Sequence, residues 1–360
     1  MSLWQLCERF RCIAIIGMEK NAGKTTVLNY LLKHAARKTV AITSIGYDGE
    51  DTDQITQTDK PRIYVGRGTI VATAVGLLGR CDVTRELLKF TGFATAMGEV
   101  VLLRALSDGY VQIAGPSINA QMEKLVQMLI ELNVDKIFID GAASRKSSAA
   151  IAPADACILA TGAAFSPDPD FLVEQTAFYA GLFNLPAVEQ SEIKEFFASP
   201  LSEVADHNGD NDVYAKVGAS DSARLGNALD VETAGSAALV KDLKVLVFKG
   251  VMPTGFAARF LEKTRDLQGL QIIVRDGTRL LLTLDQYREF TRRGATFSVC
   301  RQVPVLAVTV NPTSPSGLLI DSAYLKSRIE KLTRLPVFDL VNENQPQLID
   351  ELIDHLSKIR

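Results

Sequence analysis

The stretch Ile15–Thr26 reads IIGMEKNAGKTT, and it is the most informative segment of the chain. The pattern G-x-x-x-x-G-K-[ST] is typical of loops that hold phosphate groups. Gly23, Lys24 and Thr25 match the end of this pattern. Met18 stands where the first glycine is usual, and Gly17 lies one residue earlier. The match is therefore strong at one end of the loop and shifted at the other.

The flanking residues place this run between a strand and a helix. Residues 12–16 (CIAII) are a continuous apolar run, which is typical of a buried parallel strand. Apolar residues then recur with helical spacing over 24–36, and a second strand is predicted over 39–45. This order is a βαβ unit, and it puts the glycine-lysine pair at the start of a helix.

Each residue type in the loop would make a different contribution to phosphate binding. Gly23 lets the backbone approach closely, Lys24 adds a positive charge, and the Thr25 hydroxyl is a ligand for Mg²⁺. Lys20 is either a second cation for phosphate or a solvated loop charge. The predicted phosphate-binding set is Gly17, Lys20, Asn21, Ala22, Gly23, Lys24, Thr25 and Thr26. The alternative is a strand-to-helix turn that binds nothing.

Acidic residues follow two further predicted strands. Asp140 ends the apolar run 137–139, where it would orient Mg²⁺ or cap the next helix. Asp48 and Glu50 follow the second strand in a polar stretch, as metal ligands or as solvated charges. We predict a metal site made of Thr25, Asp48, Glu50 and Asp140, with Lys24, Asp48 and Asp140 as the catalytic residues.

Two other groups have weaker signals. Arg145 and Lys146 follow Asp140 and are candidates for phosphate contact or for a subunit interface. Asn311 ends a predicted strand over 305–310, where its amide would read a purine edge or cap the following loop.

The alternation of strands and helices predicts an α/β protein with mostly parallel sheets. We expect a nucleotide-binding domain over 1–185, a linker or irregular segment over 186–240, and a second, smaller α/β domain over 241–360. A single continuous sheet is the alternative. Residues 99–104 and 110–114 flank Ser-Asp-Gly, which indicates a hairpin.

Composition excludes several classes of protein. The net charge of -3 and the lack of a basic run argue against nucleic acid as a partner. The five cysteines include no C-x-x-C pair, so free thiols in a reducing compartment are expected. Without an apolar run of membrane-spanning length or a secretion signal, we expect a cytoplasmic protein that does not enter a membrane.

The motifs also carry a resemblance to known families. The order of strand, Gly-Lys-Thr-Thr, the Asp48 strand and Ile-Asp-Gly-Ala at 139–142 resembles the dethiobiotin synthetase and MobB class of P-loop proteins. Residues 16–26, 43–51, 60–65 and 104–117 are similar to the KamB-type subunit of lysine 5,6-aminomutase reactivase. This likeness covers most of the first 145 residues and, more loosely, the C-terminal half.

The resemblance implies a function and partners. It implies an ATPase that uses ATP and Mg²⁺, with a MutS-like second subunit, to restore an adenosylcobalamin-dependent aminomutase. A homodimer is a further assembly that we consider. A biosynthetic ligase or kinase of the dethiobiotin type, and a nucleotide-gated binding module, are the alternatives. The chain has no Asp-x-His-x-x-Gly stretch for cobalamin, so we do not expect it to hold the corrinoid itself.

Overall fold

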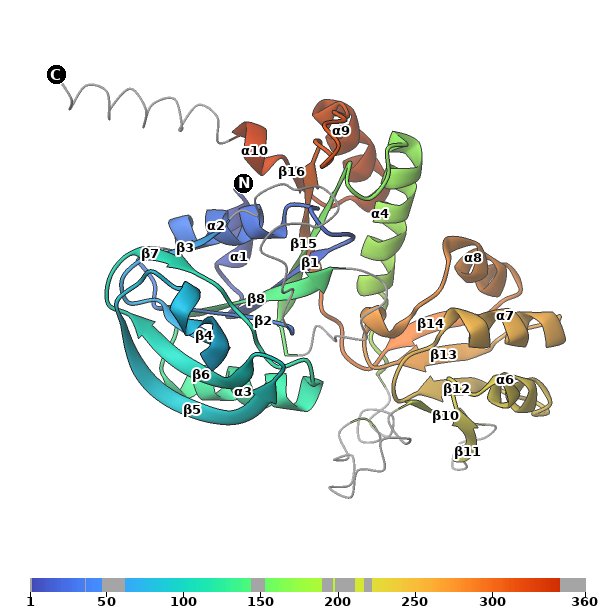
Figure 1. Ribbon diagram of the computed structural model, residues 1–360. Coiled ribbons are helices and arrows are strands. Elements are labelled where there is room, and N and C mark those ends of the chain that lie inside the picture. Colours follow the sequence, from blue (N-terminus) through green and yellow to red (C-terminus); the bar gives the residue numbers. More distant parts are fainter. Residues whose placement is uncertain are drawn as a thin grey trace. The chain divides into compact units, whose positions relative to one another are not determined.

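In the computed structural model, β1 (Cys12–Gly17) lies near the middle of a nine-stranded sheet. The structure describes residues 2–35, 37–46, 62–143, 153–189, 197, 211–216 and 222–343. The chain forms two units, Met1–Ala177 with Pro304–Arg360, and Phe178–Val303. Figure 1 labels most of the elements of both units.

The larger unit is built on the nine-stranded sheet. In spatial order the strands are β16 (Val337–Phe338), β15 (Val305–Asn311), β9 (Ala156–Gly162), β1, β8 (Lys136–Ala143), β2 (Val40–Ser44), β4 (Ile70–Ala74), β6 (Gly98–Ala105) and β5 (Arg85–Thr95). The strands from β16 to β4 run parallel, whereas β6 is antiparallel to both of its neighbours, β4 and β5. The parallel strands carry apolar residues on both faces, as strands covered on both sides must.

Helices join and cover these strands. They are α1 (Leu3–Cys7), α2 (Lys24–His34), α3 (Asn119–Glu131), the part of α4 (Pro169–Phe183) up to Ala177, α9 (Ser322–Thr333) and α10 (Leu340–Glu343), with the short η1 (Val75–Arg80) after β4. Val27, Leu28 and Leu31 of α2 are buried in the same core cluster as side chains of β1 and β2. The predicted βαβ unit at the start of the chain is therefore present.

A buried lysine ties α1 to the sheet. Lys136, at the start of β8, is 4% exposed, and its Nζ donates to the carbonyl oxygens of Cys7, Glu8 and Phe10 at 3.0, 2.6 and 2.5 Å. A cation at the carbonyl end of a helix satisfies acceptors that have no partner within the helix. Burial lowers the pKa of Lys136 and raises the pKa of the nearby Cys7 thiol to about 12.

The predicted hairpin at Ser-Asp-Gly is wrong. β6 pairs with β4 and β5, whereas β7 (Gly109–Val111) pairs with β3 (Ile63–Val65) in a separate two-stranded ribbon. A tight turn does link β6 to β7, but each strand finds its partner elsewhere. Turn-forming residues indicate where the chain reverses locally, but they do not determine which strand each segment pairs with.

The smaller unit has a mixed sheet in the order β11 (Ser222–Asn227), β10 (Asp212–Lys216), β12 (Val245–Phe248), β13 (Gln271–Val274) and β14 (Thr296–Val299). The last three strands are parallel and β10 is antiparallel to both of its neighbours. The unit also contains α6 (Val231–Ala238), α7 (Thr254–Lys263) and α8 (Leu284–Arg292), which Figure 1 labels, and the short η3 (Gly277–Arg279).

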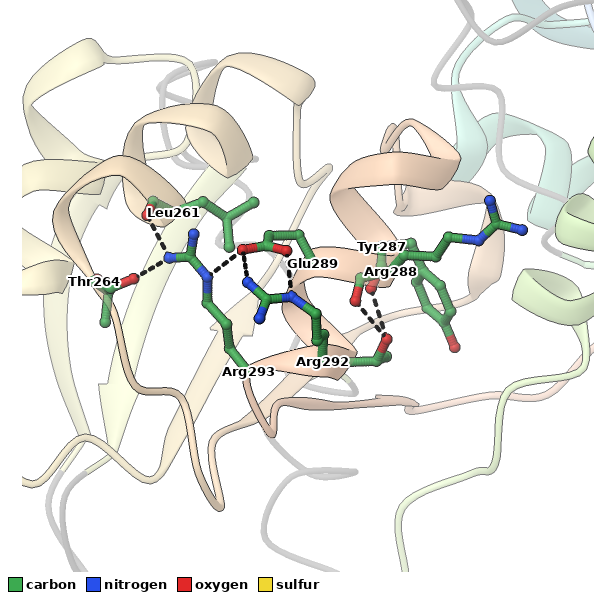
Figure 2. A network of polar contacts seen from close by, with 8 residues as sticks. Leu261, Thr264, Tyr287, Arg288, Glu289, Arg292 and Arg293 are labelled. Atoms are coloured by element: carbon green, nitrogen blue, oxygen red, sulfur yellow. Dashed lines mark hydrogen bonds and ion pairs between the residues drawn. The ribbon is translucent and has the colours of Figure 1, made fainter.

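One charged network links two of these helices (Figure 2). Glu289 of α8 accepts from the Arg292 guanidinium at 2.6 and 2.8 Å and from Arg293 Nε at 2.7 Å. Arg293 also donates to the carbonyl oxygens of Leu261 and Thr264 at the end of α7. Hydrogen bonds from Arg292 and Arg293 lower the pKa of Glu289 to about 2.

The domain boundaries differ from those predicted over 1–185, 186–240 and 241–360. The segment expected to be a linker contributes β10, β11 and α6 to the smaller unit. The last part of the chain, from Pro304, belongs to the larger unit, where β15 pairs with β9. Alternating strands and helices predict a sheet, but they do not show which of two sheets a strand joins. Within the described part of the chain, no helix is both long and apolar enough to cross a membrane.

Candidate functional site at the end of β1

The turn between β1 and α2 has two residues in the left-handed region. Asn21 has a φ of 60° and Gly23 a φ of 94°. Gly23 is the residue that precedes α2, and no side chain caps the helix there. The first N–H groups of a helix have no acceptor within the helix, and the helix dipole makes this end positive. The turn therefore offers backbone donors to an anion.

Gly17 makes room for the Lys24 side chain. A Cβ atom placed on Gly17 would lie 2.9 Å from both Cδ and Nζ of Lys24. The lysine thus folds back from the first turn of α2 across the end of β1. This explains why the glycine stands one residue earlier than in the usual pattern. The Lys24 side chain needs the space beside residue 17, whereas residue 18 is a buried methionine.

Neighbouring strands hold the turn in place. The Met18 N–H donates to the Ala160 carbonyl of β9 at 2.9 Å, and Asn311 Nδ2 donates to the Asn21 carbonyl at 2.9 Å. The Lys20 N–H donates to the Glu19 carboxylate at 2.9 Å. Ala22 is buried, while Lys20, Thr25 and Thr26 are half-buried. The sequence-predicted phosphate-binding residues therefore lie together in one turn and the start of one helix.

Asp140 lies on the strand next to this turn. Its Cα pairs with Ile15 of β1 on one side and with Ser44 of β2 on the other. The Asp140 Oδ1 atom is buried. The following Gly141 is closely packed, since a Cβ there would lie 2.6 Å from the Ile15 carbonyl oxygen. The carboxylate predicted to orient a metal is thus on the strand adjacent to β1.

The end of β2 is fastened beside Asp140. The Ile45 N–H donates to the Asp140 carbonyl at 2.9 Å, and the Ser44 hydroxyl donates to the Gly46 carbonyl at 2.8 Å. The Gly115 N–H donates to the same hydroxyl at 3.2 Å. Asp48, Glu50, Arg145 and Lys146 lie outside the described residues, so their predicted roles stay predictions.

Sequence reasoning missed the contact between Asn311 and the turn. The side-chain oxygen of Asn311 also accepts from the Thr313 N–H at 3.3 Å, which supports the loop-capping alternative. The sequence carried only one signal, a polar residue at the end of a strand. Nothing in it could show that β15 lies beside β9 and thereby brings Asn311 to Asn21.

The site offers donors suited to an anion and oxygen atoms of the kind that hard metal ions prefer. It combines backbone donors, a lysine that lies across the end of the strand, the Thr25 hydroxyl and the Asp140 carboxylate. Among the described residues, no group of three or more His, Cys, Asp or Glu side chains is placed to hold a metal. A Mg²⁺ ion here would take much of its coordination from phosphate oxygens and water, as this ion commonly does.

Comparison with known proteins adds no family to this description. No protein-family model matches the chain, and no curated protein and no solved structure matches it.

Proposed function

We propose that the turn from Gly17 to Thr26 binds the phosphates of ATP together with Mg²⁺, and that the chain hydrolyses the nucleotide. One observation carries this proposal. Lys24 lies across Gly17 at the uncapped start of α2, after two residues in the left-handed region. A turn with backbone donors and one lysine suits a triphosphate better than an uncharged ligand.

Different residues would serve phosphate binding and metal binding. The backbone N–H groups of the turn would hold phosphate oxygens, and Lys24 would place its charge on the β and γ oxygens. Thr25 and Asp140 would hold Mg²⁺, directly or through water, and we add Asp48 and Glu50 as further ligands. Mg²⁺, when bound, neutralises negative charge on the phosphates. Fixed charges at this point favour the transition state because they need no rearrangement during the reaction.

Calorimetry with the Lys24→Ala variant tests the proposal. The parent chain should bind MgATP, and the variant should bind it about ten- to a hundredfold more weakly because a charged hydrogen bond is lost. The variant should also lose ATP hydrolysis. Lys33→Ala is the matched control, since Lys33 is an exposed lysine in the last turn of the same helix. Equal affinity of the parent and Lys24→Ala chains would refute the phosphate role.

We further propose that ATP turnover serves the reactivation of an adenosylcobalamin-dependent aminomutase of the lysine 5,6-aminomutase type. The support is the resemblance of residues 16–26, 43–51 and 104–117 to the KamB-type subunit. A MutS-like subunit would be the partner. ATP can drive the opening of the aminomutase only if the ATP-bound and hydrolysed states differ in their affinity for it.

Reconstitution decides between this role and a biosynthetic one. Inactivated aminomutase, fresh adenosylcobalamin, MgATP and the MutS-like subunit should recover turnover with the parent chain and fail to do so with Lys24→Ala. Recovery without this chain would exclude the role. ATPase activity stimulated by a small carboxylic or amino acid, and not by protein, would favour the ligase or kinase alternative.

A further inference from the structure

Asn311 is held on several sides at the end of β15. Its Nδ2 donates to the Asn21 carbonyl at 2.9 Å and its Oδ1 accepts from the Thr313 N–H at 3.3 Å. Its own carbonyl accepts from the Ala163 N–H at 2.9 Å. Exchanging the amide oxygen and nitrogen would set an oxygen against a carbonyl and an NH₂ group against an N–H. The two contacts therefore fix the orientation of the side chain.

The contact acts on the conformation of the turn. Asn21 has a φ of 60°, which costs energy for a residue other than glycine. A peptide group is planar, and its C=O and N–H point in opposite directions. By fixing the Asn21 carbonyl, Asn311 also fixes the direction of the Ala22 N–H. A Cβ on Gly23 would lie 3.5 Å from the Asn311 Cβ, so Asn311 packs beside Gly23 as well.

We infer that Asn311 is a positioning residue that keeps the turn in its phosphate-binding conformation. This inference rests on the proposed function. It makes β15, which comes from the C-terminal part of the chain, a component of the nucleotide site. Both ends of the Asn311 amide contact the backbone, and one of these contacts is with the turn itself.

The Asn311→Asp variant separates this role from general stability. Aspartate has nearly the same size and still accepts from Thr313, but it cannot donate to the Asn21 carbonyl. Asn227→Asp is the matched control. Asn227 lies in the smaller unit, and its Oδ1 accepts from the Leu229 N–H at 2.9 Å in a similar local turn. Both changes add one negative charge.

Hydrogen exchange and MgATP binding test the inference. In the nucleotide-free chain, amide hydrogen exchange over residues 17–26 should be faster in Asn311→Asp than in the parent, and unchanged in Asn227→Asp. The dissociation constant for MgATP should rise at least about tenfold in Asn311→Asp, because one hydrogen bond is lost and a negative charge is added near the bound phosphates. The Michaelis constant for ATP should rise in parallel, while kcat at saturating ATP falls less. Asn227→Asp should bind MgATP as the parent does.

The outcomes are distinguishable. Parent-like exchange over residues 17–26, or a parent-like MgATP affinity, in Asn311→Asp would overturn the inference. Faster exchange across the whole larger unit together with a lower thermal midpoint would also overturn it, because that result indicates a structural role only. If the parent chain fails to bind MgATP, the proposed function is wrong, and the exchange rates still decide whether Asn311 holds the turn.

Discussion

At the scale of single residues, the pair Gly17 and Lys24 has the clearest consequence. The lysine occupies space that any side chain at position 17 would need, since two of its atoms lie 2.9 Å from the point where a Cβ would stand. Lys24 is flexible, so a methyl group would displace it without forcing the backbone to move. The glycine is therefore required for the placement of a charge rather than for a backbone angle.

The Gly17→Ala variant should keep the fold and lose nucleotide affinity. We expect MgATP to bind about tenfold more weakly, because the displaced Lys24 no longer makes its charged hydrogen bonds. The thermal midpoint of the nucleotide-free chain should stay near that of the parent. Gly255→Ala is the control, since a Cβ there meets nothing within 4 Å. Parent-like MgATP binding by Gly17→Ala in calorimetry would show that the position of Lys24 does not matter.

At the scale of elements, Glu289 links α8 to α7 through Arg293 (Figure 2). Hydrogen bonds from Arg292 and Arg293 lower the pKa of Glu289 from 4.5 to about 2. Because the pKa is lower in the folded state, the contribution to stability is fully present above about pH 4.5 and is lost as the pH falls toward 2.

The Glu289→Gln variant should therefore be less stable than the parent near neutral pH, and the difference should shrink as the pH falls through this range. Scanning calorimetry of the full chain at pH 7 and at pH 3 measures the midpoint of the smaller unit. Glu262→Gln is the control, because its pair with Arg259 at 3.4 Å is exposed on both sides and should contribute little. If the difference in midpoint between Glu289→Gln and the parent is the same at pH 7 and pH 3, the ionised Glu289 does not stabilise the smaller unit.

Elements that depend on neighbouring residues were predictable, and pairings between distant segments were not. The strand, turn and helix from Cys12 to His34 follow from an apolar run, a glycine and helical spacing. The β6–β7 hairpin was predicted wrongly because the turn signal is local, whereas β6 pairs with β4 and β5, and β7 pairs with β3. The contact of Asn311 with Asn21 joins residues that are 290 positions apart, and no local pattern reports it.

At the scale of the whole molecule, the chain leaves the larger unit after Ala177 and returns to it at Pro304. The smaller unit is thus inserted in the sequence of the larger one. The alternation of strands and helices continues through Pro304, so the sequence predicted two α/β parts but placed residues 304–343 in the wrong one. The return of the chain matters for function because it adds β15, and with it Asn311, to the candidate site.

We propose that the turn after β1 holds the phosphates of ATP. The most direct measurement is a crystal structure of the full chain with Mg²⁺ and a non-hydrolysable ATP analogue. We predict phosphate oxygens against the backbone N–H groups of residues 22–25 and against Lys24 Nζ, with Mg²⁺ near Thr25 and Asp140. An analogue bound elsewhere on the chain, with this turn free of phosphate, would contradict the claim.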